Sequence, residues 1–126
     1  MLSAKALLLC GSTGGLIGVI LGAFGSHGLK AKLTPDMLAV WQTAVEYQFF
    51  HSLALLAAGL LLLNQPASSL TGWAGAAFTL GILLFSGSLY ALALTGIKPL
   101  GAITPLGGLS LIIGWSLLIA SIWRLN

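Results

Sequence analysis

The residues best suited to chemistry gather in one stretch, from Trp41 to His51, which reads Trp-Gln-Thr-Ala-Val-Glu-Tyr-Gln-Phe-Phe-His. This stretch runs without a break into an apolar segment, from Ser52 to Leu63. Ionisable groups at the mouth of a membrane-spanning helix are costly, and by default they indicate a functional site. The sequence therefore says where a site lies, although it does not name a ligand.

Glu46 and His51 are the acid and the base of this stretch, and helical geometry separates them. Glu46 points about 140° away from His51, whereas Tyr47 and His51 form an i, i+4 pair. A direct acid–base dyad within one helix is therefore disfavoured. We expect Glu46 to meet a loop lysine or the start of the last helix. For His51 we expect a neutral imidazole hydrogen-bonded to another helix, with ligand, proton or metal duty as the alternative.

Composition places the chain in a membrane. Of 126 residues, 58% are hydrophobic and only 6% are charged, against about 25% charged in a soluble domain. The net charge of +3 comes from scattered cations without a basic run, so nucleic acid is not an expected partner. The single cysteine excludes an intrachain disulfide and a Cys-rich metal site. Membrane lipid is the expected surrounding partner.

Four apolar spans fit the length, since each needs about 20 residues. We predict an all-α integral membrane four-helix bundle, a single domain over residues 1–126, with helices at about 4–26, 35–63, 72–95 and 105–124. The first run is longer than a secretory signal core, so it is interpreted as a retained helix. Thr34 and Thr104, each followed by proline, are expected to cap two helices, and Gly28 suits a helix end.

Glycines line one face of the first predicted helix. On a helical wheel they fall within about 100° of one another. Such a face allows close backbone approach, because lipid tails do not drive membrane helices together. The face is interpreted as packing inside the bundle, with contact between subunits as the alternative, and a homo-oligomer is expected. Its members are Gly11, Gly14, Gly15, Gly18, Gly22 and Gly25.

Most polar side chains of the spans converge on one side of the membrane. An even number of spans places residues 25–42 and 96–104 on the same side, and the opposite half reads almost entirely as Leu, Ile and Ala. The predicted polar cluster comprises His27, Glu46, Tyr47, Gln48, His51, Ser86, Ser88, Tyr90 and Thr104. Orientation is not decided, because the cations on the two sides nearly balance.

Several segments resemble the domain of unknown function 423 family, whose small bacterial membrane proteins are similar to the animal transmembrane protein 256. The resemblance implies a multi-pass protein of the bacterial inner membrane with cytoplasmic termini, and no established activity. The segments that carry it are Gly22-Ala-Phe-Gly-Ser-His-Gly-Leu, the stretch from Trp41 to Leu56, Phe85-Ser-Gly-Ser-Leu-Tyr, and the run from Leu94 to Gly108.

Two function classes stay open. The first is a non-enzymatic oligomeric or accessory component, whose polar cluster holds its own helices, a lipid headgroup, a small ligand or a partner. The second is a small-solute or ion transporter or channel, although the first helix lacks a carboxylate near the bilayer midplane. A haem or quinone protein is a third reading, with only His27 and His51 as imidazole ligands. No catalytic constellation, metal site or cofactor is predicted.

Overall fold

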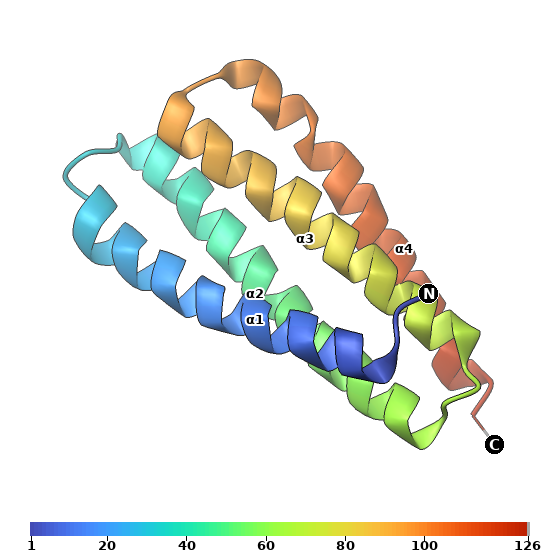
Figure 1. Ribbon diagram of the computed structural model, residues 1–126. Coiled ribbons are helices and arrows are strands. Elements are labelled where there is room, and N and C mark those ends of the chain that lie inside the picture. The colour runs from blue at the N-terminus through green and yellow to red at the C-terminus, as the bar shows by residue number, and fades with distance from the viewer. Residues whose placement is uncertain (126) are drawn as a thin grey trace.

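The computed structural model describes residues 1–125, which form four long helices joined by short connections (Figure 1). The α-helices are α1 (Ala4–Phe24), α2 (Pro35–Asn64), α3 (Ser69–Thr95) and α4 (Thr104–Trp123). A π-helix, η1 (Gly25–Leu29), extends α1, and a 3-10 helix, η2 (Lys98–Ala102), precedes α4. Each of the four is long and apolar enough to cross a membrane, and residues 1–125 contain no strand. The predicted fold class is confirmed.

Side-chain caps explain where three of the helices begin, and Ser3 caps α1 by accepting from the Ala6 N–H over 3.2 Å. The Thr34 hydroxyl accepts a hydrogen bond from the Met37 N–H over 3.2 Å, ahead of Pro35 in the first turn. Ser68 caps α3 in the same way, accepting from the Thr71 N–H over 3.4 Å. Because of this cap, α3 begins at Ser69, whereas the apolar pattern places its start near residue 72.

Thr104 does not cap α4, which corrects the sequence prediction. Ile103 precedes the helix with helical backbone angles, so Thr104 already lies within α4. Its hydroxyl instead meets the Ser88 hydroxyl of α3 over 2.6 Å. The Thr104 hydroxyl therefore links α4 to α3 instead of capping α4.

The predicted helix end at Gly28 is also wrong, because α1 continues through η1 to Leu29. Trp41 of α2 packs where a Cβ on Gly25 would stand, 2.5 Å from its indole nitrogen. The same indole N–H donates to the Leu21 carbonyl over 3.0 Å. The backbone N–H of Gly25 donates to this carbonyl as well. A side-chain donor entering the helical ladder accounts for the wider turn at this point.

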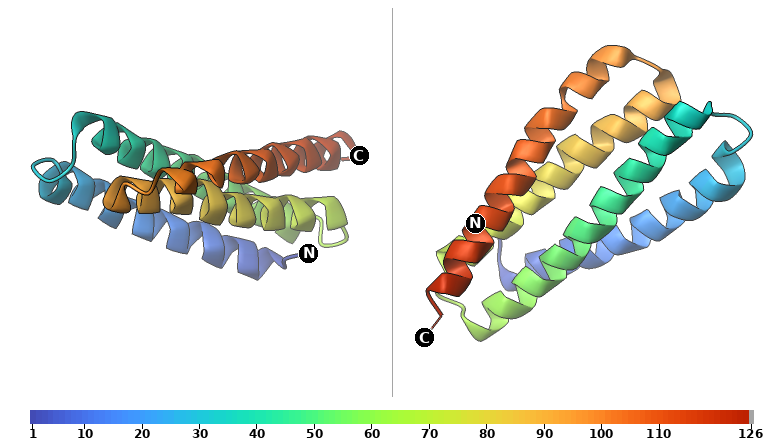
Figure 2. Two further views of the ribbon diagram at one scale, coloured as in Figure 1. Left: turned by 90° about the horizontal axis from the view of Figure 1, so that it is seen from above. Right: turned by 180° about the vertical axis from the view of Figure 1, so that it is seen from behind.

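The helices pack in chain order, α1 on α2, α2 on α3 and α3 on α4, so that α1 and α4 form opposite edges (Figures 1 and 2). We call the end that carries residues 25–34 and 96–103 the loop side, and the end where α1 begins and α4 ends the terminal side. The main core contains Leu7, Leu55, Phe78 and Leu111. Because the helices zigzag rather than close on themselves, hollows remain between alternate helices.

Candidate functional site

Gln48 joins three helices near the middle of the bundle. Its side-chain N–H donates to the Gly14 carbonyl of α1 over 2.8 Å, and its carbonyl oxygen accepts from the Tyr90 hydroxyl of α3 over 2.6 Å. Gln48 itself is only 4% exposed. In lipid no water is available for such groups, so the amide and the phenol stabilise the contacts of α2 with both neighbours.

His51 uses both of its ring nitrogens within the chain. Nδ1 lies 2.7 Å from the Tyr47 carbonyl, and Nε2 lies 3.1 Å from the indole nitrogen of Trp115 on α4. A carbonyl only accepts and an indole only donates, so the ring must be neutral, with its proton on Nδ1. This is the interhelical role predicted for His51, and it leaves no ring nitrogen free for a haem or a metal.

The hydroxyls of α3 also bond to neighbouring helices. Ser86, which is 1% exposed, donates to the Ala44 carbonyl of α2 over 2.7 Å. Ser88 bonds to Thr104 of α4, and it also donates to the Phe85 carbonyl within its own helix over 3.0 Å. Ser86 also lines one pocket with Gln48 and Tyr90, whereas Ser88 links α3 to α4 outside that pocket.

His27 does not join the other site residues. It is exposed within η1, on the loop side of the bundle. Its neighbour Gly25 packs on Trp41, which lies ten residues before His51 on α2, or about 15 Å along the helix. The two histidines therefore do not line one pocket, because the α1–α2 register places them at different depths.

Glu46 is placed away from the start of α4, contrary to expectation. It is exposed, and it lines a small pocket beside Gly22 and Ser26, at the margin between α1 and α2. Among residues 1–125 it makes no hydrogen bond or ion pair. The start of α4 lies against α3 instead, because Gly107 touches the backbone of Phe85.

The glycine face of α1 is occupied by α2. A Cβ on Gly14 would overlap the Ser52 hydroxyl, and one on Gly18 would stand 2.9 Å from the Phe49 ring. Gly11, Gly22 and Gly25 also meet α2, whereas Gly15 has no neighbour within 4 Å. The face is thus used within the chain and is not free for a second subunit.

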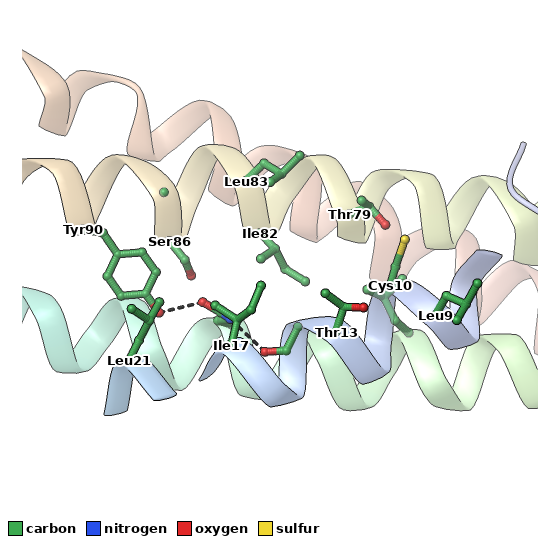
Figure 3. A pocket seen from close by; sticks show the side chains of 14 residues that line it. Leu9, Cys10, Thr13, Ile17, Leu21, Thr79, Ile82, Leu83, Ser86 and Tyr90 are labelled. Carbon is green, nitrogen blue, oxygen red and sulfur yellow. Dashed lines mark hydrogen bonds between the residues drawn. The ribbon is translucent and has the colours of Figure 1, made fainter. Parts of the chain in front are cut away.

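Two grooves open sideways from the bundle. The first, which we call the Gln48 groove, lies between α1 and α3 with α2 as its floor, and its volume is about 460 Å³ (Figure 3). The second, the His51 groove, lies between α2 and α4 over Phe85, with a volume of about 710 Å³. Aromatic rings line the His51 groove, where Tyr47 stacks on Phe85 with centroids 4.2 Å apart. Both grooves are largely apolar.

Sequence reasoning missed two features. The first is Trp115, the partner of His51, because α4 is almost wholly apolar and its sequence pattern does not predict which residue Trp115 contacts. On the terminal side, the hydroxyls of Ser68, Thr71 and Ser121 bond to one another, with Ser68 within 2.8 Å of Thr71 and 3.0 Å of Ser121. That half is therefore not purely apolar, and the capping pair Ser68 and Thr71 was its only signal in the sequence.

No group of three or more His, Cys, Asp or Glu side chains gathers within residues 1–125.

Comparison with known families shows to which family the chain belongs. A family profile described as "Protein of unknown function (DUF423)" matches residues 21–108. The chain belongs to the DUF423 family. Relatives named UPF0382 membrane protein occur in Staphylococcus haemolyticus, 45% identical over 100 residues, and in Staphylococcus epidermidis, 44% identical over 100 residues; each match covers 79% of this chain and 80% of the relative. The UPF0382 membrane protein YwdK of Bacillus subtilis is 42% identical, over 79% of this chain and 81% of its own.

These DUF423 relatives are named as membrane proteins, and their names state no enzymatic activity. No solved structure matches the chain. The segment matched to the family runs from Leu21 through the loop side to Gly108, so it contains the Gln48–Tyr90 and Ser88–Thr104 contacts but neither Gly14 nor Trp115. The chain is thus a four-helix membrane protein from a family of unknown function.

Proposed function

We propose that the protein is a non-enzymatic, multi-pass accessory component of the bacterial inner membrane, which acts through its lipid-facing surface and as a homo-oligomer. One observation carries this proposal: Gln48, His51 and Ser86 are committed to hydrogen bonds between helices. Side chains engaged in this way hold the bundle together, and they are not available to bind and release a solute or to transfer protons to a substrate.

The carboxylate of the spans supports the same conclusion. Transport through a helical bundle relies on ionisable groups that face its interior or a water-filled cavity. Glu46 instead lies on the outer margin between α1 and α2. The two grooves open toward lipid and are apolar, which favours contact with apolar partners over passage of an ion.

Flux measurements in proteoliposomes test this proposal against the transporter reading. Vesicles loaded with a pH indicator should show the same decay of an imposed proton or potassium gradient with and without the protein. Glu46→Gln should leave that decay unchanged. Saturable flux that requires Glu46 would overturn the proposal and establish a transporter.

The edges of the bundle support the oligomeric part of the proposal. α1 and α4 each pack mainly on one neighbouring helix, so a second copy has an open edge at either side. Native mass spectrometry of protein released from lipid nanodiscs should show multiples of the 12.9 kDa chain. A single-chain mass at all protein concentrations would contradict this part. Cytoplasmic termini stay a prediction from the family resemblance.

A further inference from the structure

The Gln48 groove has the dimensions of one hydrocarbon chain. Along α1 it extends from Leu9 to Leu21, which is about 18 Å at the rise of an α-helix. Its volume of about 460 Å³ holds roughly fifteen groups of about 30 Å³, the space of a water molecule in the liquid. Figure 3 shows its walls, with Ile17 and Leu21 on one side and Leu83 on the other.

Charge at the loop-side end of the groove selects the headgroup. Tyr90, which lines this end, packs in one cluster with Leu29 and Leu33. Between these two leucines the chain presents Lys30 and Lys32, both exposed. Two lysines at the level of the headgroups attract an anionic lipid, because each basic residue near such a surface contributes favourably.

We propose that the Gln48 groove binds one acyl chain of an anionic diacyl phospholipid. The chain lies along the groove from Leu21 towards Leu9, and the phosphate faces Lys30 and Lys32 at the loop-side end. The bound lipid lies along the membrane normal and covers the side of α1 that α3 leaves open. This site is independent of oligomeric state, and it does not depend on the absence of transport.

Two glycines provide a matched pair of variants. Gly87 lines the groove, and Gly15 does not, while neither has a neighbour within 4 Å. Gly87→Leu therefore fills the groove without a steric clash elsewhere. Gly15→Leu adds the same side chain to another helix face. Both substitutions replace a helical glycine with a better helix former, so both variants should fold.

Native mass spectrometry with added dioleoyl phosphatidylglycerol measures the site. Wild type and Gly15→Leu should each retain one phospholipid per chain, and the apparent affinity of Gly87→Leu should fall about tenfold or more. Equal retention by Gly87→Leu, or equal loss in both variants, would overturn the proposal, since either result would mean that the lipid binds over the whole protein surface and not in this groove.

Two further lipids test the chemistry of the occupant. Dioleoyl phosphatidylcholine should bind more weakly, because it lacks net charge, and the difference should shrink in the variant with Lys30→Gln and Lys32→Gln. Palmitate alone should not displace the phospholipid. Equal binding of the neutral lipid, or displacement by palmitate, would overturn the assigned ligand.

Discussion

Trp115 of α4 donates its indole N–H to Nε2 of His51 on α2 over 3.1 Å, across the His51 groove. Apart from such side-chain contacts, α4 packs on α3. The bond therefore links two helices that are not direct neighbours. Phe78 supports it from α3, with its ring centroid 5.7 Å from His51 and 5.1 Å from Trp115.

Removing the indole N–H should lower stability while keeping an aromatic ring at this position. We expect Trp115→Phe to reduce the free energy of unfolding by about 0.6 to 1.7 kcal/mol, the range for hydrogen bonds between membrane helices. Unfolding in detergent measures this change. Trp123→Phe is the control, because Trp123 is 88% exposed. Equal stability of the two variants would contradict the bond's structural role.

Gln48 and Tyr90 should be energetically coupled. Gln48→Leu and Tyr90→Phe each remove one partner of the same 2.6 Å hydrogen bond. The double variant should therefore lose less stability than the sum of the single variants, by about 0.5 kcal/mol or more. Tyr47→Phe is the control for Tyr90→Phe, since its hydroxyl makes no hydrogen bond within residues 1–125. Strict additivity would show that the amide and the phenol act separately.

Gly14 and Ser52 should form a steric pair. Gly14→Ala places a Cβ against the Ser52 hydroxyl, and we expect a loss of about 1 to 3 kcal/mol. Ser52→Ala should be neutral or stabilising, because the buried hydroxyl has no partner. The double variant should recover most of the loss. Gly15→Ala, with open space around it, should be stabilising by up to about 1 kcal/mol. A destabilised Gly15→Ala variant would show that this face is covered in the membrane.

Glu46 should tolerate both an amide and an apolar side chain. It is exposed at the margin of α1 and α2, so Glu46→Gln and Glu46→Leu should each change the free energy of unfolding by less than about 0.5 kcal/mol. Thermal unfolding in detergent compares them. A Glu46→Leu variant that unfolds at a clearly lower temperature than Glu46→Gln would reveal a structural acceptor at this position.

Much of the fold could be predicted, because membrane helices are specified locally. Apolar length gives the spans, and Thr34 followed by Pro35 marks one helix start. Thr104 followed by Pro105 misled, since the 3-10 helix before it already supplies helical geometry at Ile103. The Thr-Pro capping pattern does not predict the backbone conformation of the residues before it.

The site could be predicted only in part. Helical geometry correctly separates Glu46 from His51, since both lie on one helix. It cannot place His27 against His51, because their relative depth depends on how Gly25 receives Trp41. Nor can it find Trp115, because its pairing with His51 depends on the rotation of α4 about its own axis. Contacts between helices need the packing of the whole bundle.

Nitrogen-15 NMR of His51 in lipid nanodiscs tests most directly whether the polar side chains of the spans are committed to one another. The ring should carry its proton on Nδ1, and Nε2 should show hydrogen-bond coupling to the indole N–H of Trp115, which Trp115→Phe abolishes. His27→Gln removes the signals of the other histidine. A proton on Nε2, or an average over both tautomers, would contradict the interhelical bond and leave His51 free to bind a ligand or transfer a proton.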